Sequence, residues 1–364
     1  MKKILRKIPC FIFSAALIVG LNIAVFSQRT LPPVAPPAPP ETKTGKPKVG
    51  PVSPPSGTPV MPPARTMPPI YPWGGEDHEK SLKVDARVNI SMCVITGNVK
   101  INGWDRNEVR IFVNEGSNIN INVRAKDRKS EQPILVDVTA LNSTDAKHKK
   151  MPMLASECIW GSEIEIDAPH DAALTIKGDE TSINIDSIRK AWVKNAGGNI
   201  TLRNIAERVD ALTYEGNVTV NDSAGVINLE SSSGNILAFN VSPAEIGDSF
   251  KAKTASGKIF LQQIEQRQIE VNSISGAVMY TGKLVSGGLY SFSTSNGAIT
   301  LAIPADSSSK LNASYGYGQF NCDFQLKDVR KDMTSFKNIS GVIGSGDAML
   351  KLSTHDGSIK IKKQ

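Results

Sequence analysis

Few residues of this chain have the types and the spacing that a catalytic or metal site requires. Its 364 residues include four histidines, and none has a second metal ligand beside it at the spacing of a zinc site. Ser307 and Lys310 match a Ser-x-x-Lys pair in letters only, because they follow Pro304 in a polar stretch. The sequence lacks a Gly-x-Ser-x-Gly elbow, a phosphate-binding glycine loop and a His-Glu-x-x-His helix. We therefore predict a protein that is not an enzyme and that uses no cofactor or metal. The histidines are His78, His148, His170 and His355.

The net charge of +7 comes from the first 72 residues. Residues 1–27 contain four basic residues and no acidic residue, and residues 28–72 contain five basic residues and one acidic residue. From totals of 42 basic and 35 acidic residues, 33 basic and 34 acidic residues remain in 73–364. A body without excess positive charge is not expected to bind nucleic acid, because such binding depends largely on basic contacts with phosphates.

The N-terminal segments carry features of export. Residues 1–27 combine a basic start with an apolar run, which predicts a signal peptide of the Sec type, with an uncleaved anchor as the alternative. Residues 28–79 are predicted to be a disordered, proline-rich linker, since 16 of the 22 prolines lie between residues 31 and 72. No later segment is apolar enough to span a membrane. We therefore expect a periplasmic, cell-surface or extracellular protein with no transmembrane span after signal cleavage.

Export also permits disulfide bonds. Three cysteines lie beyond the predicted signal peptide, namely Cys93, Cys158 and Cys322. Cys93 with Cys158 is the pairing to consider, and a reduced, unpaired state is the alternative.

Beyond His78 the sequence alternates with a period of two, and one template recurs about every 20 residues. Each unit is centred on a glycine. Apolar residues precede the glycine by seven and five positions, a small polar residue precedes it by three, and apolar residues follow at two and four. In the unit centred on Gly357 these positions are Leu350, Leu352, Thr354, Ile359 and Ile361.

The repeat predicts strand, turn and strand in every unit, with the glycine in the turn. Thr181 replaces the glycine in one unit, Gly116 centres a unit with a bulge, and a degenerate unit is expected around Gly341. The turn glycines of the other units are Gly97, Gly198, Gly216, Gly234, Gly257, Gly276, Gly297, Gly318 and Gly357.

One such unit has an apolar face that it cannot bury alone, whereas stacked units share a continuous core. We predict an all-β fold, a parallel β-solenoid of strand–turn–strand units, with an antiparallel β-sandwich or meander as the alternative. An N-terminal β segment is expected over 80–170, with a basic loop insertion at 124–163, followed by a β-repeat domain over 171–364. The asparagines directly after four glycines are expected to stack as an amide ladder. They are Asn98, Asn199, Asn217 and Asn235.

The stretch Thr96–Val113 reads Thr-Gly-Asn-Val-Lys-Ile-Asn-Gly-Trp-Asp-Arg-Asn-Glu-Val-Arg-Ile-Phe-Val. This resembles the opening of the bacterial putative-adhesin family of β-strand-repeat domains of unknown function, and the later glycine units up to Ile361 are similar to it as well. The resemblance covers about residues 80–364. It implies an envelope or secreted β-repeat protein, and it supplies no catalytic residues to carry over.

Outward side chains of the repeat give the candidate binding surface. Successive outward positions such as Asn228, Glu230, Lys251 and Lys253 form no stack of acids, which weakens an assignment as a polysaccharide-degrading enzyme. Four outward aromatic residues are possible binding residues for sugars or a protein partner. They are Trp192, Tyr214, Phe239 and Phe260.

Together these features favour an exported, non-enzymatic protein of the bacterial cell envelope that acts by adhesin-like binding or as a scaffold. Its partner is expected to be an envelope polysaccharide or a protein. One alternative is a β-helix protein that binds or degrades polysaccharide. The other is an envelope-stress component that binds another protein.

Overall fold

The computed structural model describes residues 78–141, 157–332 and 336–364, which form strands β1–β25. The predicted signal peptide (1–27) and nearly all of the predicted linker (28–79) lie outside the described residues. Among the described residues, no helix is long and apolar enough to cross a membrane.

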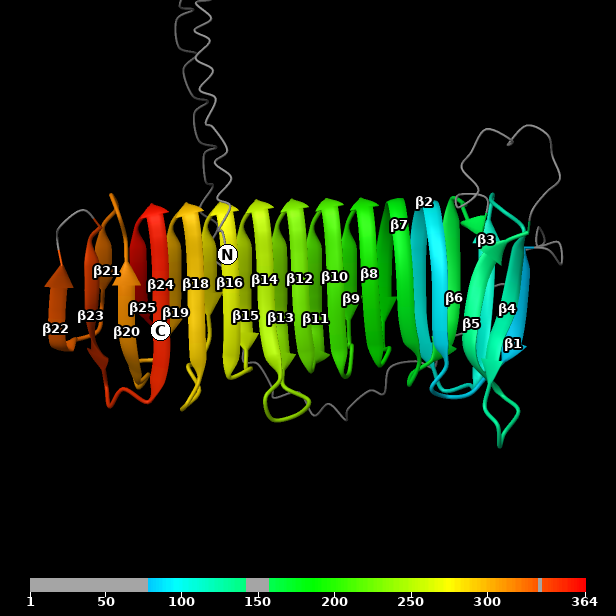
Figure 1. Cartoon of the computed structure of the whole chain (residues 1–364), viewed down its shortest axis with the longest axis horizontal. Coiled ribbons are helices and arrows are strands. Elements are labelled where there is room, and N and C mark those ends of the chain that lie inside the picture. The colour runs from blue at the N-terminus through cyan, green and yellow to red at the C-terminus, as the bar shows by residue number, and fades with distance from the viewer. Residues whose placement is uncertain (1–77, 142–156, 333–335) are drawn as a thin grey trace, which may run out of the picture. The chain divides into compact units, whose positions relative to one another are not determined.

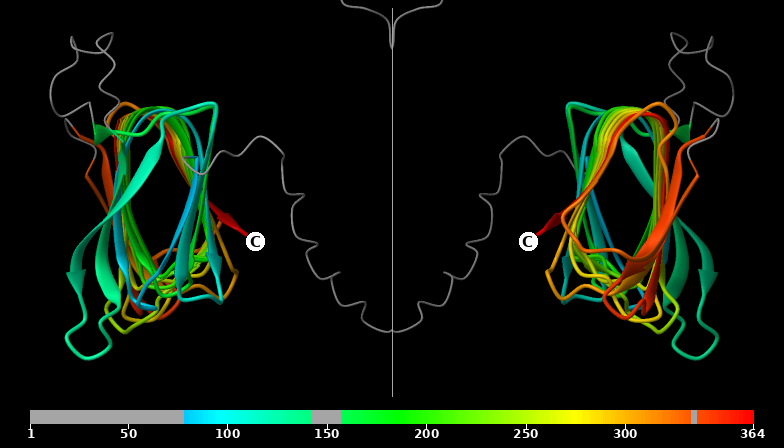
Figure 2. Two further views of the ribbon diagram at one scale, coloured as in Figure 1. Left: turned by 90° about the vertical axis from the view of Figure 1, so that its right-hand side faces the viewer. Right: turned by 90° about the vertical axis from the view of Figure 1, so that its left-hand side faces the viewer.

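The strands confirm the parallel β-solenoid. Each turn of the solenoid, here called a coil, contributes one strand to each of two walls, and the coils stack side by side along one axis (Figure 1). In the view along that axis, the two walls form a flattened ring (Figure 2). Wall A runs, in spatial order, through β8 (Lys190–Gly197), β10 (Arg208–Glu215), β12 (Val226–Ser233), β14 (Ser249–Ser256), β16 (Gln268–Ser275), β18 (Leu289–Asn296), β24 (Ala348–Asp356) and β20 (Ser309–Ser314). Wall B runs through β9 (Ile200–Arg203), β11 (Val218–Ala224), β13 (Ile236–Ser242), β15 (Ile259–Ile264), β17 (Val278–Thr281), β19 (Ile299–Ile303), β25 (Ile359–Lys363) and β21 (Phe320–Cys322).

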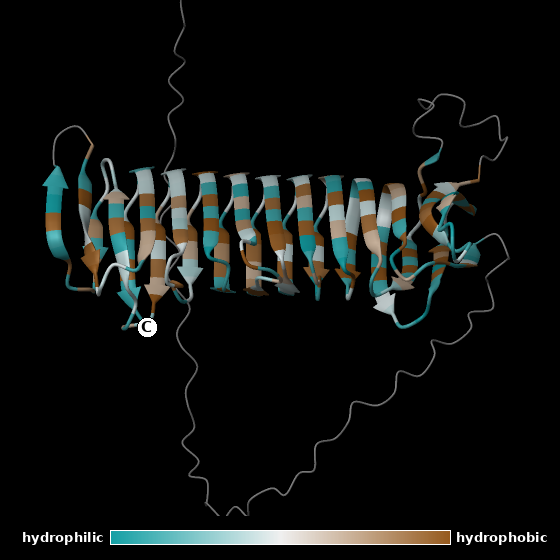
Figure 3. Cartoon of the chain, turned by 60° about the horizontal axis from the view of Figure 1, so that its bottom comes forward, coloured by the Kyte–Doolittle hydropathy of each residue, from teal (hydrophilic) through white to brown (hydrophobic). Residues whose placement is uncertain are grey.

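The core fills the space between the walls, because alternate side chains of every strand point inward. Figure 3 shows the resulting bands of hydrophobic and hydrophilic residues along the strands. The sequence template identifies the inward positions correctly. In the unit of Gly216 the five template residues are at most 3% exposed, namely Val209, Ala211, Thr213, Val218 and Val220.

From Gly216 onward the turn glycines stack in one column along the solenoid, each against the carbonyl group of the turn glycine in the neighbouring coil, and Gly198 faces the Thr181 carbonyl oxygen in the same way. A Cβ atom on Gly257 would lie 2.0 Å from the carbonyl oxygen of Gly234, and Gly257 has a φ of +153°. Any side chain at this position would therefore separate the coils. The close approach of two backbones, as well as the turn itself, requires glycine here.

The small polar residue of the template forms a second column, inside the core. The Thr254 hydroxyl donates to the Gly234 carbonyl oxygen at 3.0 Å, and the Thr294 hydroxyl donates to that of Gly276 at 3.0 Å. Each hydroxyl thus supplies a hydrogen-bond partner to a half-buried carbonyl group of the neighbouring coil. Equivalent bonds are made by Thr213, Ser231, Ser273 and Thr354.

Asparagine side chains form the predicted amide ladder on the outside of the turns. Asn199 Oδ1 accepts from the backbone and side-chain amides of Asn217, and Asn217 Oδ1 accepts from both amides of Asn235. Asn98 is separated from this ladder, since Ser182 pairs with it and lies between the coils of Asn98 and Asn199.

The C-terminal end departs from the chain order that the repeat predicts. Strand β24 pairs with both β18 and β20, so the last coil of the sequence is inserted between the two coils that precede it (Figure 1). The unit predicted around Gly341 is wrong as a coil. Its residues form an antiparallel hairpin of β22 (Lys327–Asp332) and β23 (Asn338–Ile343), which covers the edge of β20.

The N-terminal end is closed by antiparallel strands. The long strands β2 (Asn89–Trp104) and β7 (Ala173–Asp186) pair over both walls. Outside β2 lie β5 (Pro133–Ala140), paired with β4 (Ile119–Lys126), and β6 (Glu163–Pro169), followed by β3 (Glu108–Asn114) and β1 (Glu79–Lys83). The bulged unit predicted at Gly116 is therefore wrong, because β3 and β4 are cap strands with different partners. Of the insertion predicted at 124–163, residues 124–126 lie in β4 and 133–140 in β5, and residues 142–156 lie outside the described residues.

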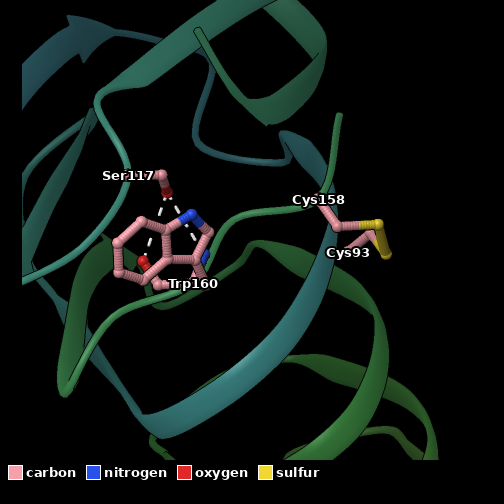
Figure 4. The surroundings of a disulfide bond; sticks show 4 residues. All are labelled: Cys93, Ser117, Cys158 and Trp160. Carbon is pink, nitrogen blue, oxygen red and sulfur yellow. Dashed lines mark hydrogen bonds between the residues drawn. A yellow bond between two sulfur atoms is a disulfide. The ribbon is translucent and has the colours of Figure 1, made fainter. Parts of the chain in front are cut away.

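Cys93 and Cys158 form a disulfide bond, with an S–S distance of 2.02 Å (Figure 4). The bond joins β2 to the short segment that leads into β6. The bridge between Val94 and Ile159 also holds this segment against β2. On its other side the segment contacts the turn between β3 and β4, where Ser117 Oγ donates to the Trp160 carbonyl oxygen at 3.2 Å and accepts from the Trp160 backbone amide at 3.1 Å (Figure 4).

Candidate functional site

The outward side chains of wall A form rows along the solenoid axis, because successive strands pair in register. Two adjacent rows matter most. The middle row consists of Glu230, Lys253, Asn272, Ser293 and Ser353, and the turn-side row consists of Ser232, Ala255, Ile274, Ser295 and His355.

These two rows and Phe336 line a groove of about 550 Å³, called here the wall A groove. It crosses β12, β14, β16, β18 and β24, and four strand spacings of about 4.8 Å give it a length of about 19 Å. Five of these eleven side chains are serine or alanine, and they leave space between larger neighbours such as Lys253, Ile274 and His355.

The middle of the groove carries a chain of hydrogen bonds. The Ser293 hydroxyl donates to Asn272 Oδ1, and Asn272 Nδ2 donates to Glu270 Oε1 at 3.1 Å. Glu270 also lies 3.7 Å from the ammonium group of Lys251. Asn272 is thereby fixed in orientation, with the hydroxyl and amide groups of the groove in half-buried positions.

One end of the groove is aromatic. The His355 ring lies between the rings of Tyr317 and Phe336, with centroid distances of 5.5 and 5.3 Å and edge-on geometry. Tyr317 is 75% exposed and Phe336 is 47% exposed, so both rings present a face or an edge to solvent. The sequence pattern does not indicate this cluster, because its three members come from separate segments of the chain. His355 lies near the end of β24.

The other end of the groove adjoins a second hollow of about 380 Å³, which crosses β8, β10, β12 and β14. Glu230 and Lys253 line both hollows. The second hollow includes Trp192 and Lys194, and the Lys194 ammonium group lies 5.8 Å from the centre of the Tyr214 ring. Wall A therefore carries a continuous outward trough with aromatic residues at both ends.

The four aromatic residues singled out in the sequence divide between the two walls. Trp192 and Tyr214 lie on wall A, in β8 and β10. Phe239 and Phe260 lie on wall B, in β13 and β15, with their ring centroids 5.6 Å apart. The structure thus brings Phe239 and Phe260 together. Trp192 pairs in register with Asp210, and Tyr214 lies four positions further along β10, so these two rings are apart on wall A. The four residues do not share one surface.

Acidic residues on wall A come from separate coils. The carboxylate of Asp210 is paired with Arg208 and accepts from Asn228 Nδ2 at 2.7 Å. Glu270 is held by Lys251 and Asn272, as described above. Within the described ranges, no group of three or more His, Cys, Asp or Glu side chains is placed to hold a metal ion.

The family described as Toastrack DUF4097 matches residues 98–362. A solved structure titled "Crystal structure of a putative cell adhesion protein from Clostridium sporogenes ATCC 15579" aligns with 79% of this chain and 99% of its own, at 10% sequence identity and a TM-score of 0.23. A TM-score this low gives no basis for inferring a shared fold or function. None of the curated proteins matches this chain.

Proposed function

Since this chain belongs to the Toastrack DUF4097 family, a family of domains of unknown function, we propose that it is an adhesin-like binding or scaffolding protein of the bacterial cell envelope. The resemblance to β-strand-repeat domains seen at Thr96–Val113 is confirmed at the level of the family. Family membership is the starting point, and what we propose beyond it is export, a location in the cell envelope and a binding role without catalysis.

One observation carries the binding role. The wall A groove presents side chains in register across five coils, on a framework whose backbone groups are already paired in the walls. A rigid surface of this kind loses little conformational entropy on binding, so many weak contacts along it add up. The carboxylates of Asp210 and Glu270 are already paired with basic and amide side chains, so we assign them a structural role and not a catalytic one.

Two further features support export. The basic and apolar pattern of residues 1–27 is typical of a signal peptide, and the proline-rich stretch after it is suited to a spacer. The bond between Cys93 and Cys158 agrees with an oxidising compartment, because structural disulfides are rare where cytosolic reductants keep thiols reduced.

The test is binding of the purified full chain to isolated bacterial cell walls and membranes. A Ser295→Trp variant fills the groove from β18, and it is expected to abolish binding. A Thr300→Trp variant places the same bulk on wall B of the same coil, in β19, and it is expected to bind normally. Turnover of an envelope polymer that is abolished by Glu230→Gln would contradict the non-enzymatic proposal.

A further inference from the structure

We infer that the wall A groove binds a linear, largely uncharged glycan that lies along the solenoid axis. This inference rests on the proposed binding function and names its ligand class. It follows from the shape of the groove, its mixture of chemical groups and its charge.

The shape fits a chain rather than a compact ligand. The groove runs across five strands and continues into the second hollow through Glu230 and Lys253. A ligand that follows this trough must be extended, because the coils place their outward side chains in rows at one regular spacing along the axis.

The chemistry of the groove matches that of sugar rings, which have hydroxyl groups at their edges and apolar C–H groups on their faces. Ser293, Ser353 and Asn272 supply donors and acceptors from half-buried positions, and their orientation is set in part by the bonds to Glu270. Phe336 and the 61% exposed Ile274 supply apolar surface beside them. Ligand sites commonly combine apolar walls with a few placed polar groups in this way.

The charge of the groove favours a neutral ligand. Glu230 and Lys253 occupy adjacent positions on β12 and β14, so the formal charges at that end of the groove balance. The second hollow adds Lys194 and Lys251 against Asp210, and the Lys251 ammonium group lies 3.7 Å from Glu270. A polyanion would require a basic surface.

The location of the groove disfavours a peptide. Peptides commonly add to a sheet through main-chain bonds at an open edge strand. The groove lies on the face of wall A, where the main-chain groups are used between coils and only side chains are available. A glycan needs only side-chain partners.

The experiment is calorimetric titration of the full chain with neutral linear oligosaccharides, in β-1,4-linked glucose, xylose and N-acetylglucosamine series from dimers to octamers. We expect affinity to rise with chain length and to level off once the ligand spans the groove. Phe336→Ala is expected to weaken binding about two- to tenfold, the range typical of an aromatic contact. Ser295→Trp is expected to weaken it more than about tenfold, while Thr300→Trp leaves it unchanged. Unchanged thermal unfolding of the three variants shows that the fold is intact.

Three outcomes would overturn the inference. In the first, no series binds, although envelope material still binds and Ser295→Trp blocks it. In the second, a charged polymer binds more tightly than the neutral chains. In the third, Ser295→Trp blocks a protein partner instead. The proposed binding function survives each of these outcomes, and it fails separately if the full chain binds neither envelope fractions nor any glycan.

Discussion

The buried hydroxyl column makes a sharp prediction about stability, and Thr254→Val tests it. Thr254 is 4% exposed, and its hydroxyl donates to the Gly234 carbonyl oxygen at 3.0 Å. Valine has nearly the same shape, so the substitution removes the donor and leaves the packing almost unchanged. The carbonyl oxygen loses its buried partner.

The magnitude follows from two opposing terms. A buried carbonyl group without a partner costs about 1–3 kcal/mol. The added methyl group returns up to about 0.8 kcal/mol through apolar burial. We therefore expect Thr254→Val to lower the free energy of unfolding by about 0.2–2.2 kcal/mol, or about 1 kcal/mol near the middle of that range.

The assay is urea unfolding of the full chain, followed by far-UV circular dichroism. Thr300→Val is the matched control, since the same change on the outward side of wall B is expected to alter stability by less than about 0.5 kcal/mol. Thr254→Val combined with Thr294→Val is expected to show additive losses, because β14 and β18 lie two strand spacings, or about 10 Å, apart. If Thr254→Val is as stable as Thr300→Val, the column does not stabilise the stack.

Three other perturbations have defined outcomes. Gly257→Ala is expected to lower the free energy of unfolding by more than about 3 kcal/mol, because its Cβ atom would lie 2.0 Å from the Gly234 carbonyl oxygen. Normal thermal unfolding of this variant would show that the stacked turns do not require glycine. Replacing Cys93 and Cys158 by serine removes a cross-link between residues 65 positions apart, and the free energy of unfolding is expected to fall by up to about 4 kcal/mol. Equal urea midpoints of the unsubstituted chain with and without reductant would refute this. Burial raises the pKa of the Tyr280 phenol above its ordinary value of 10.0, so the unfolded chain ionises first and stability falls as pH rises above about 10. Tyr280→Phe should reduce that alkaline loss, as measured by urea unfolding at pH 8 and pH 11, and an unchanged loss would argue against this cause.

The candidate groove was only partly predictable. The template placed Glu230 and Lys253 outward correctly, since alternation alone decides which side of a strand a residue faces. Phe336 and Tyr317 follow no repeat position, and only the fold brings them beside His355. By contrast, Trp192 precedes its turn glycine and Phe260 follows its own, so the strand–turn–strand template itself assigns these two residues to different walls.

The corners opposite the glycine column were also missed. Asn204, Asp222, Asn240 and Gln263 occupy equivalent positions six residues after their glycines, and all have φ between 49° and 55°. Asparagine and aspartate tolerate this left-handed conformation, so three of the four residues, all but Gln263, carried a usable signal. Asn240 Nδ2 also donates to Asp222 Oδ1 at 2.9 Å, which joins neighbouring coils at the corner.

The sequence by itself determined the unit of this protein. Alternation of period two, a turn glycine and one small polar residue recur about every 20 residues, and these local preferences suffice to define a coil and its inward side chains. Only the tertiary structure decided the order in which coils stack. The faces of all coils are nearly alike, so local pattern cannot distinguish the neighbours of β18. The hairpin of β22 and β23 covers one side of β20 and leaves its other side to β24, which places the end of the chain inside the stack. Pairing between segments distant in sequence, rather than any local preference, fixes that arrangement.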